Sequence, residues 1–429
     1  MTSRYSNSNR LLERALKVIP LGSQTLSKSH TQYPSKEAPL FLRRGLGGRV
    51  WDVDDNEYVD LVNGLLPIVL GYRDKDVDEA IQRQLEHGIS FSLATELEME
   101  LAERLIHIIP CAEMVRYGKN GSDATSAAIR LSRAYTQKER VAVCGYHGWH
   151  DWYVGSTERR LGVPTCVSKL THRFDYNQPE SLERLLQAYP NQFAAVIMEP
   201  MNSIEPLPGF LEEIQRLTHR AGALLIWDEI VTGFRYQLGG AQALFHVTPD
   251  LATFGKALGN GMPISALVGR ADVMKHMEDV FYSGTFGGEA LSLAAAIAVI
   301  DKMQREPVID TLWAQGEKLA TAVVRLIQEF GLEAVFSLSG KAPWKFFNIT
   351  VDNEHRKRII RTLFIREMLA NGVLMLSTHN ISYAHTNADV DQVITAYRSA
   401  FTLIQSELAC GDIESRFHDQ VLGPVFKVR

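Results

Sequence analysis

Short apolar segments alternate with longer amphipathic segments through the middle of the chain. The apolar segments have the length and composition of buried strands and cover residues 114–118, 141–145, 194–200, 223–229, 251–255 and 266–269. Helical periodicity occupies several of the intervals, at DATSAAIRLSRAYT, SLERLLQAY and GFLEEIQRLTHRAG. This alternation predicts an α/β fold with a mainly parallel sheet and helices on both faces. In such a sheet, ligands bind where the carboxyl ends of the strands meet the loops.

The two ends of the chain have a different pattern. Residues 40–60 alternate apolar and polar side chains, which predicts small antiparallel strands. Beyond residue 310, long amphipathic helices alternate with short strands. We therefore predict a large central domain, residues 63–309, and a smaller α+β domain assembled from both ends, residues 1–62 and 310–429.

Composition narrows the class of protein. The chain has 429 residues, of which 45% are hydrophobic and 22% charged, and a net charge of −5 without a long run of either sign. This length favours two domains, and the charge gives no sign of a nucleic-acid surface. The longest apolar run, residues 290–300, is shorter than the roughly 18 residues that span a bilayer and is typical of a buried helix. The four cysteines form no CxxC pair and the N-terminus lacks a signal-peptide core, so we expect a cytoplasmic protein with reduced thiols.

Two charged residues stand in unusually apolar surroundings. Lys256 lies in the glycine-rich segment TPDLATFGKALGNGMPISALVG, where it is either an ordinary loop lysine or an amine held in a pocket for its chemistry. Asp228 directly follows an apolar strand in LLIWDEIVTGFR, and a carboxylate there is costly unless it caps the next turn or meets a cation.

Two further patterns indicate binding of a phosphate and of a flat ring. In RYGKNGSDATS a strand ends in a turn and a helix follows, so Gly121 and Ser122 are placed either to bind a phosphate at the helix N-terminus or simply to cap it. Tyr146, in GYHGWHDW, lies just beyond a strand end, where its ring can stack on a flat ligand. His147 and His150 are three positions apart, but a third ligand of suitable spacing is missing, and we predict no metal site.

Together these features describe a site for pyridoxal 5′-phosphate (PLP). The aldehyde of PLP needs a lysine amine, and apolar surroundings lower the pKa of an amine toward nucleophilicity. The pyridine nitrogen needs a carboxylate that keeps it protonated, the phosphate needs N–H donors, and the ring needs a stacking partner. The 28 positions between Asp228 and Lys256 leave room for one helix and the next strand, so both can lie at the same edge of the sheet.

These segments resemble the class III aminotransferases. The likeness extends over nearly the whole chain and is most specific in WDEIVTGFR, TFGKALGNGMPISALVG and SGTFGGEALSLAAA; it is closest to glutamate-1-semialdehyde 2,1-aminomutase and its aminotransferase relatives. The resemblance implies the fold type I architecture of PLP enzymes, PLP as cofactor, and a homodimer with shared active sites. It also implies small-molecule substrates, an amino donor and a carbonyl acceptor.

Carried over position by position, the resemblance assigns residue roles. Lys256 would form the Schiff base and move protons, and Asp228 would pair with the pyridine nitrogen. The remaining contacts would be Gly121 and Ser122 with the phosphate, Tyr146 and Val231 with the two faces of the ring, Glu199 near the ring hydroxyl, and Thr285 with the phosphate of the other subunit.

Departures from the aminomutase pattern favour an aminotransferase. Residues 146–164 look shorter than the loop that closes over the aminomutase intermediate, and an aminotransferase must instead release its first product. Lys28 stands where aminomutases carry an arginine for the substrate carboxylate, residues 372–386 lack their glutamate, and Glu289-Ala290 replaces the usual Asn-Pro. We therefore predict transfer from an amino acid to a keto acid or keto sugar, with an aminomutase as the alternative. A PLP decarboxylase, a racemase and a non-catalytic PLP-binding protein are less favoured.

Overall fold

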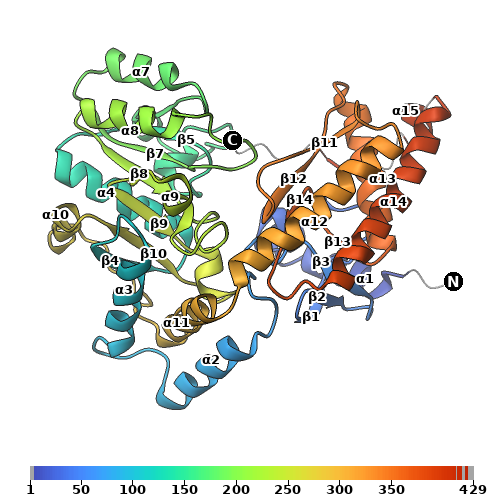
Figure 1. Ribbon diagram of the computed structural model, residues 1–429, viewed down its shortest axis with the longest axis horizontal. Helices are drawn as coiled ribbons and strands as arrows, with labels where there is room; N and C mark the ends of the chain where they lie inside the picture. Colours follow the sequence, from blue (N-terminus) through green and yellow to red (C-terminus); the bar gives the residue numbers. More distant parts are fainter. Residues whose placement is uncertain (1–3, 412, 418–420, 424–429) are drawn as a thin grey trace. The chain divides into compact units, whose positions relative to one another are not determined.

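A computed structural model of the chain describes residues 4–411, 413–417 and 421–423 and divides into two compact units. Unit 1 contains the residues up to Leu65, Val69–Asp74, and those from Asp310 onward. Unit 2 contains Leu66–Ile68 and Lys75–Ile309. In Figure 1 the colours of unit 2 run from light blue to amber, and unit 1 combines dark blue with orange and red.

Unit 2 is built on a sheet that, within the described residues, has seven strands in the order β4-β10-β9-β8-β7-β5-β6. The strands are β4 Met114–Gly118, β5 Arg140–Cys144, β6 Thr171–Arg173, β7 Phe193–Met198, β8 Leu224–Asp228, β9 Leu251–Phe254 and β10 Ser265–Gly269. The central strands pair in parallel, as predicted, whereas β10 is antiparallel to both β4 and β9. The connection from Phe254 to Ser265 is too short for the helical crossover that a parallel neighbour requires.

Helices cover both faces of this sheet. The helices of unit 2 are α2 Lys75–His87, α3 Glu96–Ile108, α4 Gly121–Thr136, α5 Asp151–Val154, α6 Thr165–Ser168, α7 Pro179–Ala188, α8 Phe210–Arg220, α9 Gly240–Phe245, η4 Lys256–Gly259, α10 Ala271–Met274, η5 Lys275–Glu278 and α11 Ala290–Arg305. In β8, Leu224 and Ile226 pack into the core cluster that includes Leu131 of α4, and Leu225 and Trp227, which point the other way, are equally buried. A strand buried on both sides explains its continuous apolar sequence.

The apolar run that the sequence analysis interpreted as a buried helix lies within α11. In Figure 1 this helix runs beside α2, and its alanine-rich face is buried. Among the helices of the described residues, none combines the length and the apolar composition needed to cross a membrane.

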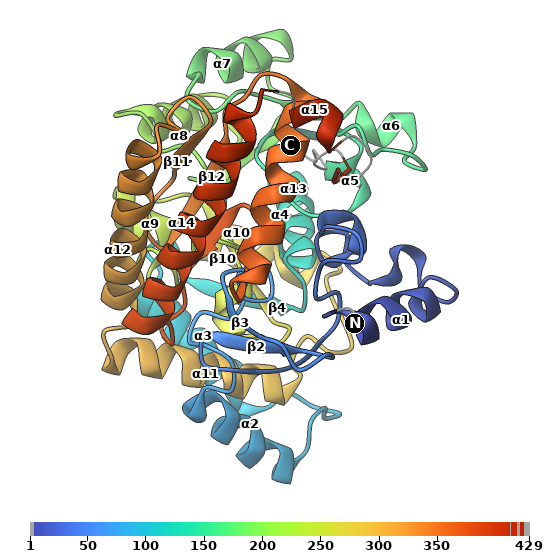
Figure 2. The ribbon, with the colours of Figure 1, turned by 90° about the vertical axis from the view of Figure 1, so that its right-hand side faces the viewer.

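Unit 1 contains two smaller sheets and the longest helices. Its elements are α1 Ser6–Ala15, η1 Pro20–Gly22, η2 Leu26–Lys28, η3 His30–Gln32, β1 Leu42–Leu46, β2 Arg49–Asp52, β3 Glu57–Asp60, α12 Val308–Glu329, β11 Phe336–Ser339, β12 Trp344–Ile349, α13 Glu354–Ala370, β13 Val373–Leu374, β14 Thr378–Asn380, α14 Asn387–Ala409 and α15 Ile413–Arg416. Strands β1, β2 and β3 are antiparallel, and β13, from the C-terminal part, joins them in parallel. Figure 2 shows α13 and α14 side by side.

Two buried histidines of unit 1 are held in the neutral form. His379 shares a hydrogen bond of 2.6 Å, through Nε2, with the hydroxyl of Tyr397, and burial lowers its pKa to about 3. His385 accepts a hydrogen bond on Nδ1 from the Ser382 N–H at 3.0 Å, and burial lowers its pKa to about 4. A protonated ring at either position would bring a charge into the core, and the cost of its burial outweighs the favourable interactions there.

These histidines predict that the protein loses stability in mild acid. Their folded-state pKa values lie below the unfolded value, so the unfolded chain binds more protons as the pH falls from 7 toward 4. Between pH 7 and pH 5 each histidine should lower the free energy of unfolding by about 2 kcal/mol. Urea denaturation at both pH values measures the change. His379→Gln should flatten the dependence, whereas replacement of the exposed His87 by Gln should leave it unchanged.

Candidate active site

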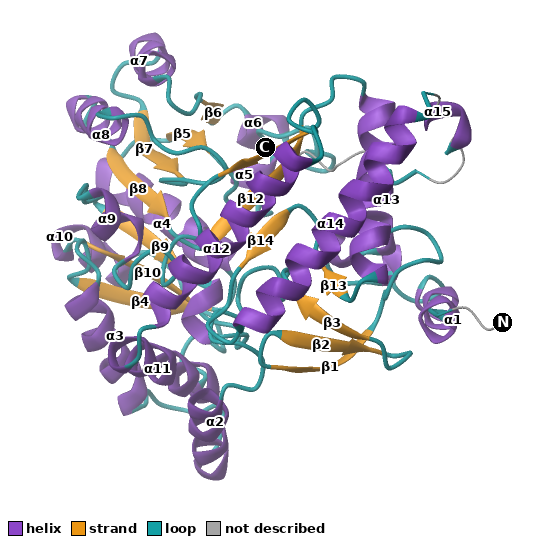
Figure 3. Ribbon diagram, turned by 45° about the vertical axis from the view of Figure 1, so that its right-hand side comes forward, coloured by secondary structure: helices purple, strands orange, loops and turns teal. Residues whose placement is uncertain are grey.

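The candidate catalytic and binding residues of unit 2 follow the ends of its strands, at one edge of the sheet. Tyr146 and His147 come after β5, Glu199 after β7, Asp228 at the end of β8 and Lys256 after β9. These four strands are parallel, so their carboxyl ends meet at the same edge. Figure 3 shows β7, β8 and β9 side by side. Strand β4 is antiparallel to β10 and hence runs in the same direction as β9, which brings the start of α4 to this edge as well.

Asp228 is a buried carboxylate held by an imidazole. Its side chain is only 5% exposed, and Oδ2 lies 2.8 Å from Nδ1 of the fully buried His147 side chain. The other oxygen, Oδ1, accepts from the Ile230 N–H at 3.1 Å. His147 is itself fixed, because its carbonyl accepts from Thr125 Oγ1 of α4 at 2.9 Å. Among the described residues, none forms a hydrogen bond with its buried Nε2.

In the sequence, the spacing of His147 and His150 suggests only a metal site, and nothing in that spacing indicates the contact between His147 and Asp228. The two imidazoles have different partners, since Nδ1 of His150 lies 2.6 Å from Oγ of Ser126. The available signal was position: His147 directly follows Tyr146 just beyond β5, at the edge where β8 delivers Asp228.

A second buried carboxylate fixes the backbone at Tyr146. Glu199 is 5% exposed and accepts from the Tyr146 N–H at 2.9 Å and from Asn202 Nδ2 at 3.3 Å. Gly145, with φ +113°, makes this approach possible, because a methyl group there would lie 2.5 Å from Glu199 Oε2. The Tyr146 ring is 38% exposed and meets Tyr153 edge-on, with 5.7 Å between centroids. The backbone of Tyr146 is thus fixed by Glu199, and its side-chain ring is accessible to a ligand.

The first turn of α4 offers free N–H donors. Asp123 Oδ2 accepts from the backbone N–H groups of Asn120 at 2.7 Å and Lys119 at 3.0 Å, which closes a capping box. The next two N–H groups, of Gly121 and Ser122, belong to the first turn and have no acceptor within the helix. They point along the positive end of the helix dipole, as an anion-binding site requires.

The start of α4, the end of β8 and the turn of Lys256 converge on Ile230. A methyl group on Gly121 or on Gly255 would lie 3.1 Å from the Ile230 side chain, so both backbones approach it closely. Lys256 opens η4 with φ +38°, a left-handed conformation that is costly for a side-chain residue. Val231 follows Ile230 and is half-buried.

Two of the predicted residues lie elsewhere. Thr285 is exposed and lines a cavity of about 370 Å³ together with Tyr117, Lys119, Asp123, Arg130 and His150. Lys28 is the last residue of η2 in unit 1 and is exposed.

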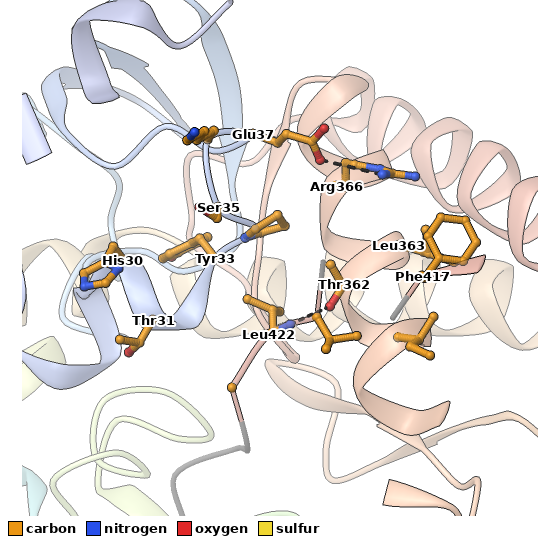
Figure 4. A pocket seen from close by; sticks show the side chains of 15 residues that line it. His30, Thr31, Tyr33, Ser35, Glu37, Thr362, Leu363, Arg366, Phe417 and Leu422 are labelled. Atoms are coloured by element: carbon orange, nitrogen blue, oxygen red, sulfur yellow. Dashed lines mark hydrogen bonds and ion pairs between the residues drawn. The ribbon is translucent and has the colours of Figure 1, made fainter. Parts of the chain in front are cut away.

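Unit 1 has a cavity of its own, about 610 Å³ in volume (Figure 4). His30 and Tyr33 lie on one side, Thr362 and Arg366 of α13 on the other, and Arg366 pairs with Glu37 at 3.7 Å. Among the described residues that line this cavity, none was predicted to contact PLP.

The groups at the sheet edge of unit 2 fit PLP. The buried carboxylate still has acceptor capacity for a protonated ring nitrogen, the first turn of α4 has unpaired donors for a phosphate, and a lysine follows the neighbouring strand. When bound, PLP supplies an aldehyde for an amine and a ring that withdraws electrons from the substrate carbon. Fold and site define a PLP enzyme of fold type I.

The chain belongs to the class-III aminotransferases, whose family model matches residues 31–393. It is 38% identical to the 3-aminobutyryl-CoA aminotransferase of Cloacimonas acidaminovorans, over 94% of this chain and 99% of that one. It is 33% identical to the glutamate-1-semialdehyde 2,1-aminomutase of Desulforamulus reducens, over 95% of this chain and all of the other. The FumI protein of Sphingopyxis sp. MTA144, solved in its PLP internal aldimine form, is 30% identical over 93% of this chain and 97% of its own, with a TM-score of 0.87.

These similarities confirm the family, the fold type and the PLP cofactor predicted from the sequence. The chain is a PLP-dependent enzyme with aminotransferase and aminomutase relatives.

The close packing behind the α4 turn predicts that Gly148 tolerates no side chain. Gly148 has φ +101°, and a methyl group there would lie 2.2 Å from Ser122 Oγ. Gly148→Ala should lower the free energy of unfolding by about 2–3 kcal/mol through backbone strain and overpacking. Gly162→Ala is the matched control, because Gly162 also has positive φ (+89°) but nothing within 4 Å. It should lose only about 1 kcal/mol in the same urea titration. Equal losses would contradict the packing argument.

Proposed function

We propose that this enzyme transfers an amino group from an amino acid donor to a small carbonyl acceptor, and that Lys256 is the amine that holds the cofactor and then moves the proton. The observation that carries the proposal is the convergence of Asp228, the first turn of α4 and the Lys256 turn around Ile230.

Each polar contact at the edge then has a task. Asp228 keeps a proton on the ring nitrogen, and His147 holds the carboxylate in one orientation, since Nδ1 lies 2.8 Å from Oδ2. The N–H groups of Gly121 and Ser122 bind the phosphate. The amine of Lys256 would hold the cofactor and, when free, would take the proton from the substrate carbon as the general base.

Tyr146 and Val231 cover the two faces of the ring. The hydrogen bond between the Tyr146 N–H and Glu199 sets the position of the Tyr146 backbone. The Tyr146 side-chain ring is placed by that backbone. Glu199 would lie on the side of the ring hydroxyl. Lys28 would supply a point charge for the substrate carboxylate, without the two-pronged geometry of an arginine.

An aminotransferase is favoured over an aminomutase by the relatives as well as by the shorter 146–164 loop. The similarity to the 3-aminobutyryl-CoA aminotransferase, at 38% identity, exceeds the 33% shared with the aminomutase. We include 3-aminobutyryl-CoA among the candidate amines, beside amino acids whose keto products are small acids. A keto acid or keto sugar is the expected acceptor. The aminomutase reaction is the second candidate, and the aminomutase relative supports it.

We further propose that two copies of the chain form a homodimer in which Thr285 reaches the phosphate of the partner. Exposed apolar side chains gather on the segments around residue 90 and on residues 281–286: Leu85, Ile89, Phe91, Leu93, Met99, Phe281 and Phe286. The two segments are adjacent, because the Ala290 N–H donates to the Ile89 carbonyl at 2.9 Å. Apolar exposure of this extent is typical of an interface.

The half-reaction tests the function. The purified enzyme is mixed with single amines (glutamate, alanine, β-alanine and 3-aminobutyryl-CoA), and its visible absorption band is recorded. We expect one or more of them to bleach the band and to release the matching keto compound. Lys256→Ala is the control and should lack both the band of the wild type and the conversion, because it has no amine for the aldehyde.

A different result would overturn the aminotransferase. If every amine leaves the band unchanged while glutamate-1-semialdehyde is converted to 5-aminolevulinate, the enzyme is an aminomutase. If Lys256→Ala retains the wild-type band, the assignment of Lys256 is wrong.

Sedimentation tests the homodimer. The wild type should sediment with twice the mass of one chain. Leu93→Asp and Phe281→Asp, at side chains that are 85% and 78% exposed, should shift the equilibrium toward monomer by burying an unpaired charge in the interface. Val324→Asp, at the partly exposed Val324 of α12, is the control and should leave the mass unchanged. If all three variants remain dimers, the interface does not include these residues.

A further inference from the structure

Three cationic side chains, from β4, from α4 and from the turn between them, hold the segment that contains Thr285. Residues 281–289, all within the described part of the chain, contain no helix or strand, and residues 285–288 form a turn. Arg130 Nη1 donates to the Phe281 carbonyl and Arg116 Nη2 to the Tyr282 carbonyl, each at 2.7 Å. At the other end of the segment, Lys119 Nζ donates to Glu289 Oε2 at 3.0 Å. Both ends of residues 281–289 are thus held by side chains of β4, of α4 and of the turn between them.

The contact between Lys119 and Glu289 differs from the other two because it is a largely buried ion pair. The side chains are 18% and 11% exposed, whereas Arg116 and Arg130 lie on the surface. Burial raises the pKa of Glu289, but the hydrogen bonds from Ser292 and Lys119 outweigh it and leave the pKa below its ordinary value. Glu289 is therefore a carboxylate whose charge depends on its partners.

Each member of the pair is also built into one of the two segments that it joins. Glu289 caps α11, accepting from the Leu291 N–H at 2.8 Å and the Ser292 N–H at 3.3 Å. On the other side, the Lys119 N–H shares the Asp123 carboxylate with the Asn120 N–H, immediately before Gly121. The pair therefore joins the residue that caps α11 to the residue that precedes the capping box of α4.

We propose that Lys119 and Glu289 are a positioning pair for the cofactor phosphate. The pair fixes residues 285–289 relative to the first turn of α4, so that Gly121 and Ser122 keep their place at the phosphate of their own subunit, while Thr285 keeps its place toward the phosphate of the partner in the proposed homodimer. This inference rests on the proposed phosphate contacts of Gly121, Ser122 and Thr285. The ammonium of Lys119 is neutralised by Glu289, so the pair acts through geometry, and the phosphate charge is met by N–H groups and the helix dipole.

The experiment compares PLP with pyridoxal, which has the same aldehyde and ring but no phosphate. The Kd of each is measured on cofactor-free enzyme by fluorescence titration, for the wild type, Glu289→Gln, Lys119→Met and the double variant. Glutamine keeps an oxygen for capping α11, and the double variant leaves no buried charge without its partner. We expect the Kd of PLP to rise about tenfold in all three and the Kd of pyridoxal to stay within about twofold. The double variant should equal the singles, because the two residues act as one unit.

Controls separate a phosphate role from a general loss of structure. Lys302→Met removes a mostly buried lysine of the same helix α11, which lies 3.5 Å from Asp76, and should leave both Kd values unchanged. Lys119→Arg keeps the charge and should retain a wild-type preference for PLP.

Two outcomes would overturn the inference and leave the proposed function intact: equal weakening of PLP and pyridoxal, which indicates a purely structural pair, or PLP binding that is unchanged or tighter. If the wild type itself does not prefer PLP over pyridoxal, the proposed phosphate site at α4 fails instead.

Discussion

A carboxylate that ends a buried strand requires compensation, and the site of unit 2 is organised around this constraint. Asp228 is the last residue of β8, which lies between the apolar strands β7 and β9. An unpaired charge at this position would cost several kcal/mol. The His147 imidazole and the Ile230 N–H are its partners. The carboxylate can accept further hydrogen bonds in addition to these two. The positions of His147, of the loop after β5 and of Thr125 on α4 all follow from the contact between Asp228 and His147.

The neighbouring Glu229 shows what a purely structural carboxylate looks like. It is fully buried, and burial raises its pKa, while its two oxygens accept from Thr232 Oγ1 at 2.7 Å, the Ala241 N–H at 2.6 Å and both the N–H and the side-chain amide of Gln242 at 3.1 Å. These donors use its accepting capacity to hold α9 in place. The two adjacent acids thus have different tasks. The oxygens of Glu229 accept four hydrogen bonds from the protein, whereas those of Asp228 keep acceptor capacity for a ligand.

The sequence predicted those features that depend on local pattern. Short, mainly apolar segments identified β4, β5, β7, β8, β9 and β10, and the Lys256 and Asp228 motifs identified the cofactor and the family. The antiparallel direction of β10 was missed because strand direction depends on the length of the connection through η4. The His147–Asp228 contact was missed because its residues are far apart in the chain and meet only when β5 and β8 are placed in the same sheet. Spatial partners of this kind leave no periodic signal.

The start of α11 at Glu289-Ala290, where the resemblance to aminomutases predicts Asn-Pro, has a physical explanation in the fold. Proline favours the first position of a helix by fixing its backbone angle, and without it another device must define where α11 begins. Glu289 does so with its side chain, which accepts from the first free N–H groups of α11. The carboxylate that replaces the missing restraint is a buried charge, and Lys119 is the cation that makes it tolerable. Glu289 is therefore half of a compensated pair, and its other half, Lys119, lies beside the turn that begins α4.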